Sequence, residues 1–253
     1  MVDADGRPHL VKSIVNSNDP HPGFLSRHRF VWLFAALLAF FVVVPIVHQI
    51  GHALHPTTGP FVEGLVFIAV LAGVVVSVST SQASRLFTLG FAFPLGVLAV
   101  LHAFHKWEGF AITRDLLGTA FLGYAIVVML RFILTSREVT FNTVCASLCI
   151  YLLLGVVWAL LYSLIDHLDP AAFYSATNDG RSAPVLRIGS GESTAVLYFS
   201  FCTLTTLGYG DIVPVTPVAR TLASLEAITG QLYLAVLVAR LVGLHIAGSL
   251  EQK

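Results

Sequence analysis

Long apolar runs constrain this chain more than any other feature. Each run approaches or exceeds the roughly 20 residues that an α-helix needs to cross about 30 Å of hydrocarbon. Of the 253 residues, 56% are hydrophobic and 11% are charged, whereas about 25% of the residues in a soluble domain are charged. The sequence therefore predicts an all-α integral membrane protein with six transmembrane helices, at 30–47, 61–79, 86–104, 116–134, 142–165 and 217–244.

The first apolar run is expected to remain attached as a helix. It is too long for a secretory signal, and no small-residue cleavage pattern follows it. The polar, proline-containing segment 1–29 before it reads as a loosely ordered tail. Lys and Arg residues favour alternate ends of the helices, which predicts that both termini are cytoplasmic and that the insert between the fifth and sixth runs is outside.

Charge and cysteine content exclude some other classes. The formal net charge is zero, so no global electrostatic attraction to nucleic acid is expected. Cys145, Cys149 and Cys202 all lie inside apolar stretches, which gives no disulfide framework. No nucleophile motif is present, so we expect no enzyme.

The insert between the last two runs departs from simple crossing. Residues 166–191 are polar and rich in turn formers, but 193–205 are apolar again. Thirteen helical residues cover roughly 20 Å, about two-thirds of the hydrocarbon core. A re-entrant helix fits this length. Because non-helical backbone at membrane depth must face protein or water, the chain that follows is expected to line a water-filled or ion-filled path.

The segment after this short helix carries the most specific motif, Thr-Thr-Leu-Gly-Tyr-Gly-Asp at 205–211. It resembles the selectivity filter of the potassium channel pore-loop family, in which four loops ring an axis and carbonyl oxygens replace the hydration shell of the ion. The order of outer helix, pore helix, filter and inner helix is similar as well. The resemblance implies a homotetramer in the lipid bilayer with K⁺ in the filter, no organic cofactor, and filter residues Thr206, Leu207, Gly208, Tyr209 and Gly210.

The residue types in this segment suit that chemistry. Gly208 and Gly210 can adopt positive φ and so aim successive carbonyls at one axis. The Tyr209 hydroxyl is expected to find a partner on the pore helix, such as Tyr198 or Ser200. Asp211 should lie at the outer mouth and attract cations or bond to the scaffold. The predicted supporting residues around the filter are Asp211, Thr205, Tyr198, Cys202 and Glu226.

Three positions on or near the inner helix carry separate predictions. Gly230 falls where the family has its inner-helix hinge. Glu226 lies one turn earlier, where a carboxylate is costly without a partner; we expect a bond to a pore-helix hydroxyl, with Thr203 a candidate, or a gating contact. Arg240 can snorkel or line the intracellular entrance.

The chain also departs from the family pattern. Leu207 replaces a more common valine or isoleucine, and Cys202 stands where some relatives have a glutamate that couples to the aspartate beside the filter. The four helices in 30–137 match a voltage sensor in number, but the fourth has a single arginine, Arg131. A voltage sensor needs several, so we expect gating of another kind, and no soluble regulatory domain.

The resulting layout has four parts. The N-terminal tail is 1–29, and the four-helix transmembrane domain is 30–137. The pore domain, 138–248, comprises outer helix 142–165, extracellular turret 166–191, pore helix 193–205, filter 206–210 and inner helix 217–245. The C-terminal tail is 249–253. The resemblance implies a plasma membrane protein of a bacterial inner membrane.

A histidine cluster leaves one alternative open. His48, His52 and His55 share a helical face, and His102 and His105 fall at the same predicted side of the membrane. Such residues can bind protons or metal ions, or they can be plain interfacial residues. The competing readings of the whole chain are a weakly selective cation channel and a metal-binding membrane protein centred on these histidines.

Overall fold

The computed structural model describes residues 29–54, 58–78, 82–104, 108–136, 140–176, 182–184 and 193–251. These residues are almost entirely helical. The helices are α2 (Arg29–Leu54), α3 (Thr58–Val78), α4 (Gln82–Phe104), α5 (Glu108–Thr135), α6 (Phe141–Leu168), α7 (Ser193–Leu204) and α8 (Pro217–Glu251). The predicted tail up to residue 28 lies outside the described residues.

A helix is found at each of the six predicted runs, and the all-α membrane class is confirmed. Within the described residues, three helical stretches are long and apolar enough to cross a membrane: Ala111–Thr135, Phe141–Leu168 and Pro217–Leu244. The described apolar stretches of α2, α3 and α4 are shorter, at Arg29–Val43, Ile68–Val78 and Thr88–Leu98. The count of six crossings therefore stays a prediction.

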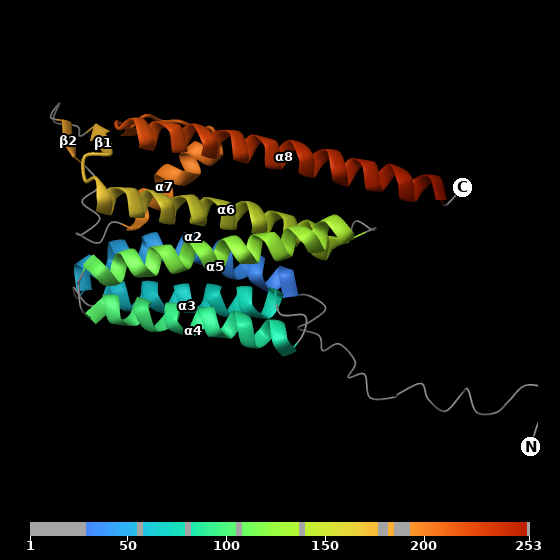
Figure 1. Ribbon diagram of the computed structural model, residues 1–253, viewed down its shortest axis with the longest axis horizontal. Helices are drawn as coiled ribbons and strands as arrows, with labels where there is room; N and C mark the ends of the chain where they lie inside the picture. Colours follow the sequence, from blue (N-terminus) through green and yellow to red (C-terminus); the bar gives the residue numbers. More distant parts are fainter. Residues whose placement is uncertain are drawn as a thin grey trace, which may run out of the picture.

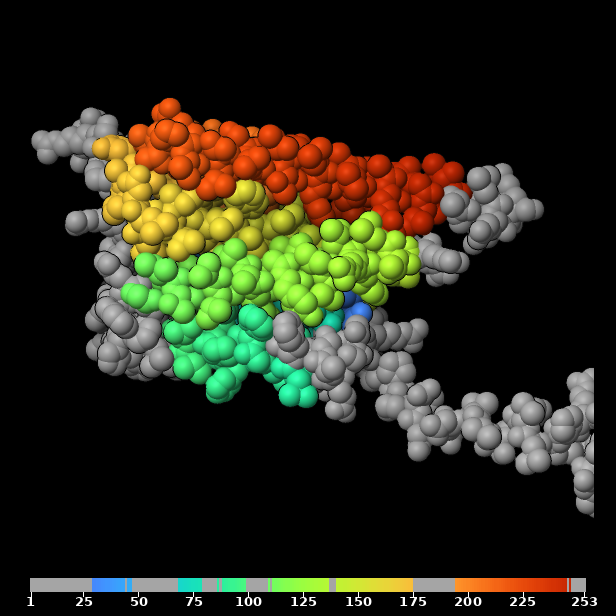
Figure 2. Space-filling view, viewed as in Figure 1, coloured from blue at the N-terminus to red at the C-terminus, as the bar shows by residue number. Residues whose placement is uncertain are grey.

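The long helices lie roughly parallel and pack side by side (Figure 1). One apolar core joins α2, α3, α4, α5 and α6, with Leu33, Val74, Leu95, Phe121 and Leu153 among its fully buried members. Large apolar side chains also cover outward faces of these helices, for example Phe93 and Leu116. Helices that are apolar on the inside and the outside are typical of a lipid environment. In the space-filling view α8, α6 and α5 follow one another as successive layers (Figure 2).

The predicted turret 166–191 is more ordered than its turn-rich sequence suggests. Its strands β1 (Phe173–Ala176) and β2 (Ser182–Pro184) join β3 (Ile212–Pro214), which follows the filter motif, in a three-stranded antiparallel sheet of order β2-β1-β3. The sheet lies at one end of the helices (Figure 1). It links the chain before α7 to the chain after the filter motif. Residues 177–181 and 185–192 lie outside the described residues.

A triangle of aromatic rings positions α7 against its neighbours. Tyr162 of α6, Phe173 of β1 and Phe199 of α7 meet edge to face, with centroids 5.6, 5.0 and 5.3 Å apart. Such pairs contribute about 0.5–1.5 kcal/mol each beyond burial of their area. A second ring of α7, Phe201, fills the space above Gly155 of α6, where an added Cβ would lie 2.3 Å from the ring. Aromatic packing therefore fixes the C-terminal half of the short helix against α6 and β1.

The opposite end of α8 is tied to α5. The Arg240 guanidinium donates to the carbonyl oxygens of Ile133, Leu134 and Ser136 at 2.6, 2.9 and 2.9 Å. These oxygens lie at the C-terminal end of α5, where free carbonyls attract a cation. Arg240 thus caps the end of α5, a contact that the sequence did not predict; its predicted parts as a snorkelling residue or at the intracellular entrance stay predictions. In addition, α8 continues to Glu251, so part of the predicted tail 249–253 is helical.

Candidate functional site

The filter motif begins where α7 ends, and its first amide groups turn back onto that helix. The Thr206 N–H donates to the carbonyl of Thr203 at 3.0 Å. The N–H groups of Leu207 and Gly208 both donate to the carbonyl of Cys202, at 2.8 and 3.2 Å. These bonds cap the carbonyls at the end of α7, which have no partner within the helix. They also fix the direction in which the chain leaves it.

The backbone after α7 alternates in handedness. φ is +58° at Thr206, +60° at Gly208 and +79° at Gly210, while Leu207 and Tyr209 have negative φ. The positive φ predicted for the two glycines is confirmed. Positive φ at Thr206 was not predicted, because a β-branched residue rarely adopts it. A strained residue of this kind costs about 1–3 kcal/mol and is typical of functional sites.

This alternation has a geometric consequence for the carbonyl groups. In an ordinary strand every residue has the same handedness, and successive carbonyls point to opposite sides. When the handedness alternates, that reversal is cancelled and successive carbonyls point to the same side. Among the described residues no hydrogen bond ends on a carbonyl oxygen of residues 206–210. The segment is therefore a row of unpaired oxygen dipoles suited to cations.

The outer end of the segment is held by Tyr198 and Asp211. The Tyr198 hydroxyl donates to Asp211 Oδ2 at 2.8 Å, and this bond to the carboxylate raises the pKa of Tyr198 above its usual value. The Tyr198 ring stacks on the Tyr209 ring, with centroids 6.5 Å apart and planes 6° apart. Asp211 thus bonds to the scaffold, as one of its two predicted roles required. In the described part of a single chain the Tyr209 hydroxyl forms no hydrogen bond with Tyr198 or Ser200, so a pore-helix partner for this hydroxyl stays a prediction.

Behind the filter segment, Glu226 of α8 is fully buried in a network of hydroxyl groups. Tyr162 donates to Glu226 Oε2 at 2.5 Å. Ser200 Oγ lies 2.5 Å from Glu226 Oε1 and 2.7 Å from the Gly155 carbonyl. A pore-helix hydroxyl as the partner of Glu226 is confirmed, but it belongs to Ser200; Thr203 was the wrong candidate. The network joins α6, α7 and α8 at one point.

The remaining predicted residues near the filter fall into different settings. Cys202 is buried and acts through its carbonyl, and the Thr205 hydroxyl donates to the Phe201 carbonyl at 2.6 Å. Gly230 lies against the end of α7, where an added Cβ would be 2.4 Å from the Leu204 carbonyl oxygen. Gly230 is therefore a position of close helix packing, and its role as a hinge stays a prediction.

The structure does not test the predicted histidine cluster. His55 and His105 lie outside the described residues, and His48, His52 and His102 lie on helices at positions whose side chains are outside the described part. Within the part of the chain that the structure describes, no three His, Cys, Asp or Glu side chains come together as a metal site.

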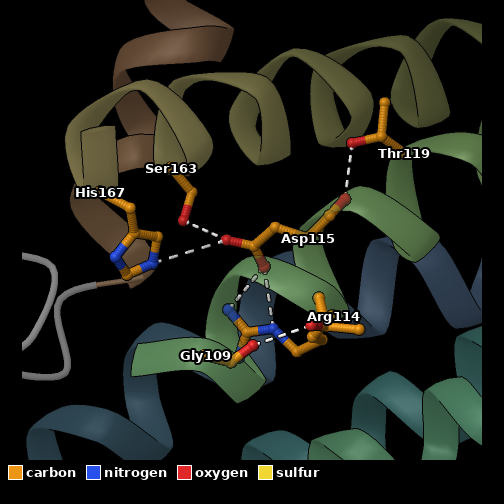
Figure 3. A network of polar contacts seen from close by, with 7 residues as sticks. Gly109, Arg114, Asp115, Thr119, Ser163 and His167 are labelled. Carbon is orange, nitrogen blue, oxygen red and sulfur yellow. Dashed lines mark hydrogen bonds and ion pairs between the residues drawn. The ribbon is translucent and has the colours of Figure 1, made fainter. Parts of the chain in front are cut away.

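A second polar network, between α5 and α6, was missed by sequence reasoning (Figure 3). Asp115 is fully buried. It accepts hydrogen bonds from Ser163 Oγ at 2.5 Å and from the Arg114 guanidinium at 2.9 Å, and His167 Nε2 lies 3.9 Å from its Oδ2. The sequence placed Arg114 and Asp115 in a loop, but α5 begins at Glu108 and contains both. The signal was an acidic residue directly before an apolar run.

Comparison with known proteins places these features in a family. A family model described as "Ion channel" matches residues 186–245, a range that contains α7, the filter segment and most of α8. The inward rectifier potassium channel Kirbac3.1 of Paramagnetospirillum magnetotacticum is 37% identical over 91 residues, which cover 33% of this chain and 29% of that protein. No solved structure matches the chain.

Both matches point to a channel rather than an enzyme, as predicted, and the apolar helices make the chain an integral membrane protein. The aligned segment spans less than a third of the length of the relative. The family model covers residues 186–245, which carry the filter motif. Residues 186–245 are therefore similar to an ion channel family, and the matched relative is a potassium channel.

Proposed function

We propose that four copies of this chain form a potassium-selective channel that conducts K⁺ passively across a lipid bilayer. The observation that carries the proposal is the alternating handedness at 206–210, which leaves a row of unpaired carbonyl oxygens on one side of the backbone. A single row cannot surround an ion. A closed ring of four rows can replace its hydration shell, and cyclic symmetry is the common way to build such a ring.

In this proposal each part of the site has a defined role. The carbonyls of Thr206, Leu207, Gly208 and Tyr209, together with the Thr206 hydroxyl, bound the K⁺ sites, and Gly210 completes the turn of the filter. Side chains that are exposed in one chain, such as Leu207 at 55% and Tyr209 at 68%, would pack against neighbouring copies. The supporting residues are Asp211, Thr205, Tyr198, Cys202 and Glu226, and Gly230 is where the inner helix would bend.

The rest of the chain fits the proposed layout. Residues 138–248 would form the pore domain, and 30–137 a peripheral four-helix domain that does not sense voltage through an arginine array. The described part of α5 carries two arginines, and one of them, Arg114, is paired with Asp115. Both termini would be cytoplasmic, and the membrane would be a bacterial inner membrane.

The proposal is tested by ion flux into liposomes that contain the purified protein. We expect K⁺-driven flux that Ba²⁺ blocks and that Na⁺ does not replace. A Gly208→Ala variant should lose this flux, because alanine resists the positive φ of +60°. Gly243→Ala is the matched control, since an added Cβ there meets nothing within 4 Å. Equal K⁺ and Na⁺ flux would instead support a weakly selective channel, and no flux from folded tetramers would defeat the proposal.

A further inference from the structure

Gln231 lies beside Thr206, the first residue of the filter segment. The close packing of the preceding residue, Gly230, brings it there. Gly230 packs so closely on the Leu204 carbonyl that no side chain fits between them. This contact sets α8 against the end of α7 and brings the next side chain on α8 to the start of the filter. There Gln231 Nε2 lies 3.4 Å from Thr206 Oγ1, as a donor to that hydroxyl.

The Thr206 hydroxyl has limited bonding capacity. It has one proton and two acceptor lone pairs. The proton is already donated to the Thr205 carbonyl, at 2.6 Å. The Gln231 amide then occupies one lone pair, so a single lone pair remains for any other partner. Both bonds also fix the direction of the hydroxyl, on a residue whose φ of +58° is unusual for threonine.

We propose that Gln231 is a positioning residue that weakens the innermost cation site of the filter. This inference rests on the proposed function. A lone pair that accepts an N–H bond cannot face a cation, and the positive end of the N–H dipole lies next to the site. The amide therefore lowers the affinity of Thr206 for a cation and lets ions leave the filter toward the inner helices. Conduction requires binding that is weak enough for the ion to leave.

The test is block of K⁺ current by Ba²⁺ added on the side of the C-terminal end of α8, in the full-length protein. A cation that enters from that side meets Thr206 before the other filter residues. Gln231→Met keeps the length of the side chain and removes the donor, so we expect block at about 2- to 10-fold lower Ba²⁺, the effect of one neutral hydrogen bond. Gln231→Glu removes the donor and adds a negative charge, so block should tighten further.

The matched control is Thr229→Val on the same helix, because the Thr229 hydroxyl donates to the Leu225 carbonyl of its own helix and to no other group in the described part of the chain. It should leave block unchanged. A double-mutant cycle of Gln231→Met with Thr206→Ala adds a second readout, since the effect of Gln231→Met should vanish once the hydroxyl is gone.

Unchanged Ba²⁺ block in both Gln231 variants would overturn the inference alone. Absence of K⁺ current in the wild-type protein would overturn the proposed function and this inference with it. If Gln231→Met does not assemble, the Gln231→Glu result decides, because an unchanged or weaker block there contradicts the proposed role of the donor.

Discussion

At the scale of single residues, the hydrogen bonds around Glu226 indicate whether its carboxyl group carries a proton. Ser200 has one hydroxyl proton but lies within bonding distance of two acceptors, Glu226 Oε1 and the Gly155 carbonyl. Tyr162 supplies a proton to the other carboxyl oxygen. All three contacts are satisfied if the carboxyl group is neutral: Glu226 then donates to Ser200, and Ser200 donates to Gly155. A neutral acid also suits a fully buried site, where charge is costly.

If the carboxyl group of Glu226 is neutral, a glutamine should be able to replace it. Its amide can donate to Ser200 and its oxygen can accept from Tyr162, so we expect Glu226→Gln to change the free energy of unfolding by no more than about 1 kcal/mol. Glu226→Ala leaves the buried Tyr162 hydroxyl without its acceptor, removes one of the two partners of Ser200 and creates a cavity, at a cost of about 2–5 kcal/mol. The measurement is thermal loss of the folded protein in detergent.

Ser224→Ala is the control for both variants, because the Ser224 hydroxyl is exposed and bonds within its own helix. It should be nearly neutral. Equal damage from Glu226→Gln and Glu226→Ala would show that a charged carboxylate is required.

The Tyr198–Asp211 bond makes a second prediction at this scale. Tyr198→Phe removes the hydroxyl that ties α7 to the residue after the filter and keeps the ring that stacks on Tyr209. We expect K⁺ current to decline faster during sustained conduction, because the outer end of the filter loses its tether. In the double variant that carries Tyr198→Phe and Asp211→Asn, K⁺ current should decline no faster than in Tyr198→Phe alone. Additive effects would mean that the two residues act independently.

At the scale of elements, the contact between α8 and α7 predicts opposite outcomes for two glycines on one helix. Gly230→Ala would place a methyl group 2.4 Å from the Leu204 carbonyl, and the helices must separate at a cost of about 1–3 kcal/mol or more. Gly243→Ala meets nothing within 4 Å and should be neutral or stabilising by up to about 1 kcal/mol. Thermal stability of the two variants checks this, and equal stability would contradict the close contact.

The α5–α6 interface makes a further prediction. Asp115→Ala leaves Arg114 and Ser163 without their carboxylate partner, and we expect a loss of about 2–3 kcal/mol. The expected loss is smaller than the cost of breaking a fully buried ion pair, because the Arg114 side chain is 20% exposed.

Hydrogen exchange should increase at the start of α5 and the end of α6 in this variant. Thr113→Val is the control, since the Thr113 hydroxyl bonds to the Gly109 carbonyl of its own helix. Exchange spread evenly over all helices would contradict a local role for Asp115.

At the scale of the whole molecule, the features that could be predicted from the sequence are those that depend on local sequence patterns. The lengths of the apolar runs predicted the helices, and the 13-residue apolar stretch 193–205 predicted a short α7 that ends at Leu204. The need for positive φ at Gly208 and Gly210 followed from glycine chemistry alone. These predictions needed no knowledge of which residues meet in space.

The features that were missed depend on contacts that sequence patterns do not specify, some of them between distant segments. Ser200 and not Thr203 meets Glu226 because the face that α7 turns to α8 is set by the packing of Phe199 and Phe201. The strained φ of Thr206 is imposed by bonds back to α7, against the preference of the residue itself. The turret strand β1 pairs with β3, which follows the filter motif, and the paired residues Phe173 and Pro214 are 41 positions apart in the sequence.

The central claim is that unpaired carbonyls at 206–210 select K⁺, and a reversal potential tests it most directly. The wild-type protein in a planar bilayer would be measured with K⁺ on one side and Na⁺ on the other. We expect a reversal potential close to the value for a membrane that is permeable to K⁺ alone. A reversal potential near zero, with current carried equally by both ions, would contradict it.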